Sequence, residues 1–347
     1  MLEPRFAIRN MRPYSPPTSG RAAFERLDFN ENTVGCSPAV LAALQGLSAA
    51  DLAVYPDYEE VLGRLSGFFG VPSSQLVLTN GTDEAIQLVV NTYVEPGDEV
   101  IVLTPTYAMY RFYAEVAGAR VVEVPLLDTG REFVVDLAAV LAAVSPRTKA
   151  VFLPNPNNPT GNVIPQDVVL EIVRACPGAA VLVDEAYFEF YGETVLGRVS
   201  EYSNLFVSRT FSKAYGLAGI RFGCLISSAR NAANLSKGHS PYSVNAVGCR
   251  AVLAAIEDQE WLTEYVKEAL AARGVIEGGL DSLGVKRWVS SANFVLFDGG
   301  GRSAEILAAC RKDGILIRDR DHDVAGTLRV TAGTVEQAER FLVVLGR

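Results

Sequence analysis

Short apolar runs alternate with helical patterns over about 150 residues of this chain, and this alternation limits the possible fold more than any other feature. The runs that we expect to form strands lie at residues 76–78, 100–103, 120–124, 150–153, 181–183 and 205–207. The patterns between them, at residues 85–94, 107–117, 136–144 and 166–174, have the spacing of helices that are apolar on one face. Repeated units of this kind predict an α/β fold with a mainly parallel central sheet.

The pattern of the chain changes after residue 243. Two long helical patterns, 246–256 and 261–272, precede a smaller α+β segment with predicted strands at 293–297, 315–318 and 327–331 and predicted helices at 304–312 and 335–345. Residues 1–20 are rich in proline and arginine and lack a core of their own. We therefore predict an N-terminal arm at 1–35 that packs on the small domain or on a partner subunit, a large domain at 36–243 and a small α+β domain at 244–347.

Composition excludes several classes of protein. The chain has 31 Lys and Arg against 40 Asp and Glu, a net charge of −9, so its surface as a whole repels nucleic acid and anionic membranes. Its five cysteines and two histidines show neither metal-ligand spacing nor a disulfide framework. No apolar run approaches the ~18 residues of a membrane span, and the N-terminus lacks the pattern of a signal peptide. We expect a cytoplasmic protein with no metal, nucleic-acid or membrane partner.

One lysine, Lys213, lies among small residues and hydroxyls in a segment that follows the apolar run 205–207. A lysine amine that loses hydration at such a junction favours its uncharged form, which attacks a carbonyl to form an imine. Thr210, Ser212 and Arg221 lie a few residues away and can hold a dianionic phosphate. An aldehyde that carries a phosphate is pyridoxal 5'-phosphate. The alternative is a solvated lysine among turn residues, because such short patterns recur by chance.

Other polar residues stand where predicted strands end. Thr82 and Asp83 begin a helix after a turn, where free backbone N–H groups and the helix dipole can bind a phosphate. Simple capping of that helix is the alternative. Asn158, Asp184 and Lys213 follow three different strands. Because ligands of parallel α/β sheets bind at the carboxyl ends of the strands, we expect these three side chains to converge.

The remaining candidates match the needs of a bound pyridoxal phosphate. Its pyridine nitrogen stays protonated beside a partly buried carboxylate, and Asp184 follows a run that is typical of a buried strand. Tyr187 and Asn158 can hydrogen-bond the ring hydroxyl, and Tyr110 can stack on the ring face. Structural alternatives are a strand-end cap for Asp184 and core packing for Tyr110.

The reaction that these groups support is transamination. A Lys213 amine that has been displaced by an amino substrate lies beside the substrate Cα, where it can move a proton between Cα and the cofactor's C4' atom. Arg329, in the predicted strand 327–331, can bind an α-carboxylate through two parallel hydrogen bonds. The alternative for Arg329 is an arginine on the surface of a strand.

Several motifs together resemble the fold-type I aminotransferases of class I/II. They follow the family order over nearly the whole chain: 158–161 (NPTG), 184–187 (DEAY), 208–213 (SRTFSK) with Arg221, and 328–331 (LRVT). The resemblance implies that Lys213 is the Schiff-base lysine and that the protein is a homodimer in which Tyr55 reaches the cofactor phosphate of the partner subunit. The cofactor-binding residues that it implies within one subunit are Thr82, Asp83, Tyr110, Asn158, Asp184, Tyr187, Thr210, Ser212 and Arg221.

Within that family the chain is similar to the histidinol-phosphate aminotransferase branch. The similarity rests on the short chain and on residues 12–14 (RPY), 30–32 (NEN), 55–57 (YPD) and 317–319 (IRD). It implies that Tyr14, Asn30, Arg318 and Arg329 bind substrate, with Tyr14 and Arg318 near a substrate phosphate.

The resemblance implies an amino transfer from L-histidinol phosphate to 2-oxoglutarate, which gives imidazole acetol phosphate and L-glutamate in histidine biosynthesis. An aromatic or other amino-acid aminotransferase and a decarboxylase of a phosphorylated amino acid are the alternatives that keep the cofactor. Residues 15–21 and 33–36 depart from the usual pattern of the branch, and both segments would line or cover the substrate pocket. A pyridoxal-phosphate-binding regulator needs a basic DNA-binding module and a nicotinamide dehydrogenase needs a glycine fingerprint after a strand, and this sequence has neither.

Overall fold

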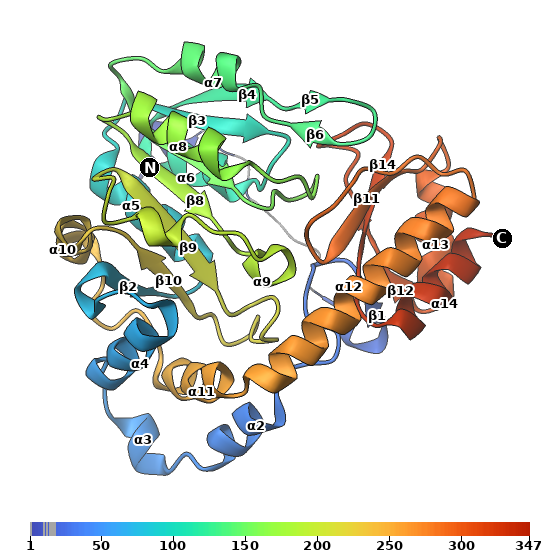
Figure 1. Cartoon of the computed structure of the whole chain (residues 1–347), viewed down its shortest axis with the longest axis horizontal. Helices are drawn as coiled ribbons and strands as arrows, with labels where there is room; N and C mark the ends of the chain where they lie inside the picture. Colours follow the sequence, from blue (N-terminus) through green and yellow to red (C-terminus); the bar gives the residue numbers. More distant parts are fainter. Residues whose placement is uncertain (1, 10, 12, 14–18) are drawn as a thin grey trace.

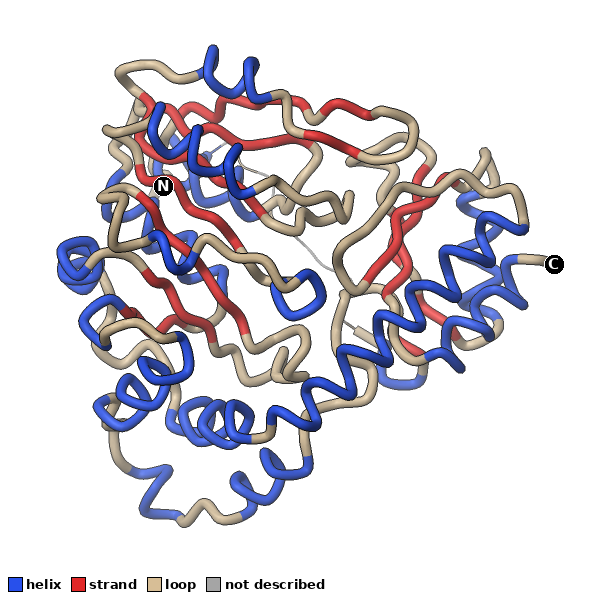
Figure 2. Tube along the Cα trace, in the orientation of Figure 1, coloured by secondary structure: helices blue, strands red, loops and turns tan. Residues whose placement is uncertain are grey.

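The structure is a computed structural model that describes residues 2–9, 11, 13 and 19–347. Figures 1 and 2 show a large lobe built around a central sheet and a smaller lobe, near the C-terminus, in which helices pack on short strands. The long helix α12 (Gln259–Ser282) runs from one lobe to the other (Figure 1). Within the described residues, no helix is both long enough and apolar enough to cross a lipid bilayer.

The central sheet of the large lobe has seven strands, and β10 alone runs antiparallel to its neighbours, β2 and β9. In order across the sheet, the strands are β2 (Leu76–Thr79), β10 (Gly223–Ile226), β9 (Leu205–Thr210), β8 (Ala180–Asp184), β7 (Thr148–Pro154), β3 (Glu99–Thr104) and β4 (Arg120–Pro125). The predicted α/β fold with a mainly parallel sheet is therefore confirmed.

The inner strands of the central sheet are buried on both faces, which explains why they are mainly apolar. Along β7, Phe152 packs into one core cluster while Val151 and Leu153 pack into the other, because successive side chains of a strand point to opposite faces. The helices that contribute to the cluster with Phe152 are α5 (Thr82–Tyr93), α6 (Met109–Ala117) and α10 (Ala229–Gly238). Those that contribute to the other cluster include α4 (Glu59–Phe69), α7 (Leu137–Ala143), α8 (Gln166–Ala175) and α11 (Ala246–Glu257).

The small lobe contains a three-stranded antiparallel sheet in the order β11 (Phe294–Asp298), β14 (Thr327–Thr331) and β13 (Arg318–Asp319). Three helices share an apolar core with this sheet: α12, α13 (Ser303–Lys312) and α14 (Val335–Leu345). The predicted α+β character of this part of the chain agrees with these elements.

The single strand predicted at 315–318 is wrong, because the structure divides it between two sheets. β12 (Ile315–Leu316) pairs in parallel with β1 (Glu25–Arg26) of the arm, whereas β13 pairs with β14. Ile317 lies between β12 and β13 and is buried in the core of the small lobe, so the chain changes its pairing partner at a residue that packs inward. The arm thus contacts the small lobe, while the domain boundaries proposed above stay predictions.

Helix α12 continues well past residue 272, where the sequence predicts its end. Gly274, Gly278 and Gly279 lower the helix propensity of this stretch, which accounts for the shorter prediction. Gly279 lies against α14, where a Cβ atom would come within 2.3 Å of the Leu342 side chain. Close packing of the two helices therefore outweighs propensity. The remaining elements are α1 (Phe6–Arg9), η1 (Arg21–Ala23), α2 (Pro38–Gln45), α3 (Ala49–Ala53), η2 (Ser73–Gln75), β5 (Leu127–Asp128), β6 (Phe133–Val134), α9 (Phe188–Tyr191) and η3 (Leu196–Arg198).

Candidate active site

A cavity of about 510 Å³ lies where β7, β8 and β9 end, and the small lobe contributes β13 and β14 to its wall. A turn of the N-terminal arm also lines it. The predicted site residues that line the cavity are Asn30, Thr82, Asp83, Tyr110, Asn158, Asp184, Tyr187, Thr210, Ser212, Lys213, Arg221, Arg318 and Arg329. Tyr14 lies outside the described residues. Tyr55 is 74% exposed and stacks on Tyr242, with ring centres 4.1 Å apart, so it does not reach this cavity within its own chain.

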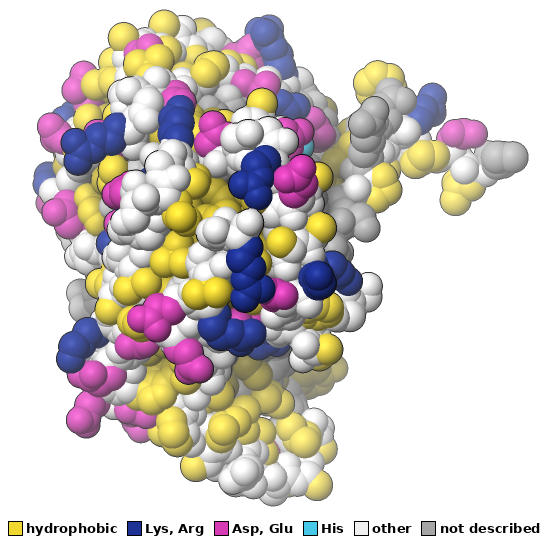
Figure 3. All heavy atoms as spheres, turned by 90° about the vertical axis from the view of Figure 1, so that its right-hand side faces the viewer, with side chains coloured by type: hydrophobic (Ala, Val, Ile, Leu, Met, Phe, Trp, Pro, Cys, Tyr) yellow, Lys and Arg dark blue, Asp and Glu magenta, His cyan; other side chains and the backbone are white. Residues whose placement is uncertain are grey.

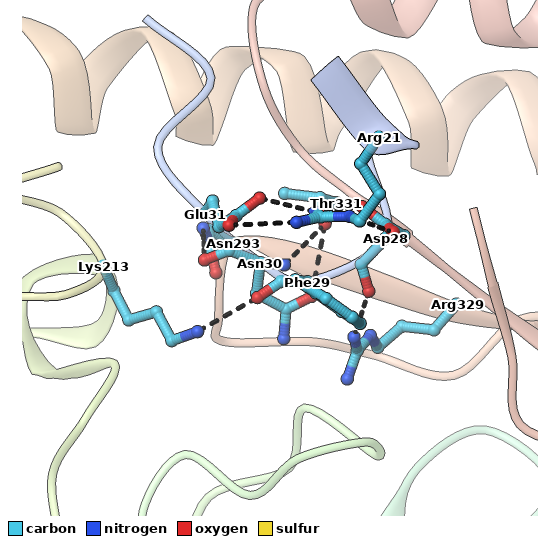
Figure 4. Close-up of polar contacts among 9 residues, drawn as sticks. All are labelled: Arg21, Asp28, Phe29, Asn30, Glu31, Lys213, Asn293, Arg329 and Thr331. Carbon is cyan, nitrogen blue, oxygen red and sulfur yellow. Dashed lines mark hydrogen bonds and ion pairs between the residues drawn. The ribbon is translucent and has the colours of Figure 1, made fainter. Parts of the chain in front are cut away.

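Lys213 lies in the turn that follows β9. Its Nζ donates a hydrogen bond to the Phe29 carbonyl oxygen at 3.0 Å and lies 5.7 Å from the centre of the Tyr187 ring (Figure 4). The turn requires glycine at position 216, because φ is +70° there and a Cβ atom would lie 2.0 Å from the Gly35 carbonyl oxygen. This local geometry holds the amine inside the cavity.

Asp184 is the last residue of β8 and its carboxylate is buried. Its Oδ1 accepts a hydrogen bond from Ser208 Oγ at 2.8 Å, and its Oδ2 accepts one from the Tyr110 hydroxyl at 2.6 Å. Burial raises the pKa of the Asp184 carboxyl to about 6, although both hydrogen bonds favour the ionised form. A desolvated carboxylate of this kind gains stability from a cationic partner in the cavity, such as a protonated ring nitrogen.

Tyr110 does not lie as the stacking prediction requires. Its side chain is 1% exposed and packs on Phe152, with ring centres 5.1 Å apart and an angle of 19° between the planes. The structure thus favours the alternative of core packing, with the hydroxyl reserved for Asp184. The half-buried Tyr107, which precedes α6, lines the same cavity and donates a hydrogen bond to Asp83 Oδ1 at 2.9 Å. Tyr107 is a candidate that sequence reasoning missed, since periodicity does not distinguish between two tyrosines three positions apart.

Phosphate donors converge at the start of α5. Arg221 adopts a positive φ of 60°, and its guanidinium lies 3.3 Å from Asp83 Oδ2 and 3.4 Å from Ser212 Oγ. Thr82 Oγ1 is buried and has no hydrogen-bond partner among the described residues. The N-terminus of α5 adds free backbone N–H groups. An orphaned hydroxyl, a guanidinium and a helix N-terminus are together suited to a phosphate group.

The small lobe brings arginines to the cavity. Arg329 is buried. Its Nη2 donates a hydrogen bond to the Asp28 carbonyl oxygen at 2.6 Å, and its Nη1 donates one to Asn158 Oδ1. Its Nε has no hydrogen-bond partner among the described residues. Arg318 stands directly opposite Arg329 in the antiparallel register of β13 and β14, and Arg320 also lines the cavity. Burial and the charges of Arg320 and Arg318 lower the pKa of Arg329 to about 9. Like charges that face each other across strands are destabilising, so this wall favours an anion.

Tyr187 and Asn30 connect the large lobe to the arm. The Asn30 side-chain amide donates to the Tyr187 hydroxyl at 3.0 Å, and the Thr331 hydroxyl donates to Asn30 Oδ1 at 3.2 Å. Among the residues that the structure describes, no group of three or more His, Cys, Asp or Glu side chains is placed to hold a metal ion.

Behind the cavity, on the opposite face of the same strand ends, lies a buried ion pair between Arg209 and Glu185, at 2.7 Å. Arg209 also stacks on Phe188, with 3.5 Å between the guanidinium carbon and the ring centre. A second carboxyl, Glu189, lies near this pair. The residue is half-buried, but its Oε2 atom is shielded from solvent and has no hydrogen-bond partner among the described residues. This desolvation raises the pKa of Glu189 to about 7 despite the charge of Arg209. The folded protein therefore disfavours the ionised form of Glu189.

Glu189→Gln is expected to remove part of the pH dependence of stability. Since the pKa of Glu189 is higher in the folded protein than its usual value of 4.5, the free energy of unfolding falls as pH rises from about 4.5 to about 7 and then levels off. The variant should be more stable than the wild type at pH 8 by roughly 1–3 kcal/mol, with a smaller difference at pH 5. Urea unfolding at both pH values measures this. Glu193→Gln, at an exposed position of the same segment, is the control, and an equal pH dependence in wild type and Glu189→Gln would contradict the prediction.

The cavity has the groups that an enzyme needs to handle amino groups through a phosphorylated aldehyde: an amine, a desolvated carboxylate and separate sets of anion donors. The family described as "Aminotransferase class I and II" matches residues 24–345. The chain therefore belongs to the aminotransferase class I and II family. This match confirms three predictions: the family, the enzyme class and the pyridoxal phosphate cofactor.

Individual relatives agree with this assignment. The chain is 36% identical to a histidinol-phosphate aminotransferase of Symbiobacterium thermophilum, and the match covers 99% of this chain and 98% of that protein. Among solved structures, it is similar to the histidinol-phosphate aminotransferase of Sinorhizobium meliloti in complex with pyridoxal-5'-phosphate, with a TM-score of 0.89, 27% identity and coverage of 99% and 96%. It is also similar to a double mutant of the Thermus thermophilus aspartate aminotransferase, with a TM-score of 0.85, 25% identity and full coverage of both chains. Similarity of fold thus extends across members with different substrates.

Proposed function

We propose that this protein is a pyridoxal 5'-phosphate-dependent aminotransferase that moves an amino group from L-histidinol phosphate to 2-oxoglutarate, within histidine biosynthesis. The observation that carries the reaction class is the convergence of Lys213, Asp184 and the arginines on one cavity. The substrate is supported by relatives that match over their full length and bear this name. We also propose that the enzyme acts in the cytoplasm, where amino-acid biosynthesis takes place.

The residues of the cavity fit the cofactor. Lys213 would bind its aldehyde, Asp184 its ring nitrogen, and Asn158 and Tyr187 its ring hydroxyl, with Tyr107 against the ring face. When bound, pyridoxal phosphate supplies an electron sink for negative charge at the substrate Cα. The groups that would hold its phosphate are Thr82, Thr210, Ser212, Arg221 and the backbone N–H groups at the start of α5. The Asp83 side chain is not among them, because its carboxylate pairs with Arg221 and Tyr107.

The protein's own part in the reaction is to orient the substrate and to move one proton. Nζ of Lys213, which lines the cavity, would take the proton from the substrate Cα as a general base. Arg329 would bind the α-carboxylate of glutamate or 2-oxoglutarate. Arg318 of β13 and Arg320, which directly follows that strand, would bind the second anionic group. This group is a carboxylate in glutamate and a phosphate in histidinol phosphate.

Arg329→Ala should lower kcat/KM for glutamate by about 100-fold, because it removes a buried partner of a carboxylate. The absorbance of the bound cofactor should not change. Stopped-flow mixing of the cofactor-loaded variant with glutamate measures the rate. Arg302→Ala, at an exposed arginine directly before α13, is the control. Loss of the cofactor absorbance would instead show that Arg329 supports cofactor binding.

We propose that the enzyme is a homodimer in which Tyr55 completes the partner's site. Exposed apolar side chains gather around α2 and α3, namely Leu41, Leu52, Val54, Tyr55 and Tyr242. Figure 3 shows hydrophobic side chains at the lower end of the molecule, where Figure 1 places α2 and α3. Such a patch is typical of a surface that another subunit covers.

A mixed dimer tests this arrangement. Lys213→Ala and Tyr55→Ala subunits, each inactive or nearly so alone, should regain part of the wild-type activity when they are unfolded, mixed and refolded together. Recovery requires that one of the two sites in the mixed dimer receives an intact Lys213 and an intact Tyr55. Absence of recovery, with mixed dimers present by mass spectrometry, would contradict a shared site.

A half-reaction tests the substrate. The cofactor-loaded enzyme is mixed separately with L-histidinol phosphate, glutamate and phenylalanine, and the change in cofactor absorbance is followed. Fast change with histidinol phosphate and glutamate and slow change with phenylalanine supports the proposal. Fast change with phenylalanine and none with histidinol phosphate would make the enzyme an aromatic aminotransferase, and release of carbon dioxide would make it a decarboxylase.

A further inference from the structure

Three successive carbonyl oxygens of the arm turn, residues 28–31, accept hydrogen bonds from three different parts of the molecule. The Asp28 oxygen accepts from Arg329 at 2.6 Å, the Phe29 oxygen from Lys213 at 3.0 Å, and the Asn30 oxygen from Asn293 at 3.3 Å. Figure 4 shows Lys213 and Arg329 reaching the turn from opposite sides. The conformation of this one turn therefore fixes the positions of both the amine and the carboxylate-binding guanidinium.

The turn has a strained backbone. Asn30 has a positive φ of 56°, which is uncommon for a residue other than glycine. The Asn30 N–H donates to the Thr331 hydroxyl at 3.0 Å, which ties the turn to β14. A turn in this conformation needs restraint from the groups around it.

Arg21 restrains the turn at both ends. Its guanidinium forms two hydrogen bonds with Asp28, at 2.9 and 2.6 Å, and two with Glu31, at 3.3 and 2.6 Å (Figure 4). It also lies 4.0 Å from the centre of the Phe29 ring, and Arg318 lies 5.1 Å from the same ring. The Arg21 side chain is only 12% exposed, so these contacts are shielded from water. One guanidinium thus connects the first and last residues of the turn.

The three charged side chains also form an electrostatic unit beside Lys213. Arg21 contributes one positive charge, and Asp28 and Glu31 contribute two negative charges. Although burial opposes it, the hydrogen bond and the charge of Arg21 hold the pKa of Glu31 below its usual value, and Lys213 acts in the same direction. Glu31 and Lys213 line the same cavity, so the charges of this unit face the space that holds the amine.

Other ionisable groups share the cavity with Lys213. The carboxylates are Asp83 and Asp184, the phenols include Tyr187, and the cations are Arg221, Arg318, Arg320 and Arg329. Variants that change only Arg21 and Glu31 leave all of these in place.

We propose that Arg21 is a positioning residue of the active site: it closes the turn 28–31, presents the Asp28 and Phe29 carbonyl oxygens to Arg329 and Lys213, and cancels one of two negative charges beside the Lys213 amine. This inference concerns the same site as the proposed function and rests on it for the role of Lys213. The charges of Arg21, Asp28 and Glu31 act on the Lys213 amine in the protein without cofactor or substrate.

The test measures the Lys213 amine directly in the full-length protein freed of cofactor. Acetic anhydride labels only the uncharged amine, and mass spectrometry gives the acetylated fraction of Lys213 at each pH. Arg21→Gln should move the midpoint of labelling to higher pH by about 0.5 unit, because the extra negative charge stabilises the ammonium. Glu31→Gln should move it to lower pH by a similar amount. The double variant should return the midpoint near that of the wild type.

The two parts of the proposal separate in the double variant. The double variant has the same net charge beside Lys213 as the wild type, but it lacks the guanidinium that connects the two ends of the turn. The half-reaction with glutamate should therefore be about 10-fold slower than that of the wild type in the double variant and in Arg21→Gln. Arg287→Gln is a matched control, because Arg287 is also paired with two carboxylates, Asp281 and Glu277, far from the cavity. Its labelling midpoint and its rate should equal those of the wild type.

Opposite outcomes overturn the proposal. If the labelling midpoints of Arg21→Gln and Glu31→Gln move in the same direction, or do not move, Arg21 has no electrostatic role beside Lys213. If Arg21→Gln and the double variant react with glutamate as fast as the wild type, Arg21 does not position the active site. The labelling does not depend on which amino donor the enzyme uses, so a failure of the proposed substrate would leave this result readable.

Discussion

Lys213→Ala is expected to abolish transamination, with a loss of at least about 10⁴-fold in the rate of the half-reaction with glutamate. The variant lacks the amine that we propose both to bind the aldehyde and to move the Cα proton. No neighbouring side chain that the structure describes in the cavity is another lysine, so no second amine is placed to replace it. Stopped-flow absorbance measures the rate, and Lys213→Arg should be equally inactive, because it restores the positive charge without a nucleophilic amine.

A chemical label provides the control for this prediction. Borohydride treatment of the cofactor-loaded wild type should fix the cofactor on a peptide that contains Lys213, as detected by mass spectrometry. A label on Lys149 or on another lysine would place the nucleophile elsewhere and would overturn the assignment of the site.

Asp184→Asn is expected to reduce kcat/KM by about 10³-fold, because it replaces a buried charge with a neutral amide of the same shape and removes the proposed partner of the ring nitrogen. The fold should survive, since the neutral side chain no longer bears the cost of burying a charge. Steady-state kinetics with glutamate, at saturating pyridoxal phosphate, measures the loss.

Two further variants resolve the role of Asp184. Tyr110→Phe and Ser208→Ala each remove one hydrogen bond to the carboxylate and should have smaller effects, of about 10-fold or less. If Asp184→Asn retains most of the wild-type activity, the carboxylate is a strand-end cap, as the structural alternative holds.

The parts of the site that were predictable from sequence are those that local patterns determine. Lys213, Asp184 and Asn158 each follow an apolar run, and the carboxyl ends of parallel strands meet at one edge of a sheet. Contacts between distant segments were not predictable. Arg329 and Asp28 are 301 positions apart, and only the tertiary structure shows that one donates to the other.

Two errors have the same origin. The pattern of apolar residues does not distinguish a ring that packs in the core from one that faces a cavity, so Tyr110 was favoured over Tyr107. The run at 315–318 has the composition of one strand, but its pairing partners lie in β1 and β14, which periodicity does not reveal. Arg21 was overlooked for a related reason. No sequence pattern indicates that Asp28 and Glu31 share one guanidinium, and only the structure shows it.

The pairing of β1 with β12 has a consequence for the order of events during synthesis. The arm is synthesised before the large lobe, whereas its partners are synthesised after it. These partners include the Leu316 carbonyl oxygen, which accepts a hydrogen bond from the Leu27 N–H, and Arg329 on β14. Contacts between residues so far apart in sequence form slowly, and the large lobe can fold before the arm pairs with the small lobe. Assembly of the turn beside Lys213 is therefore among the last steps, so a nascent chain that stops before β14 should contain a folded large lobe and no working enzyme.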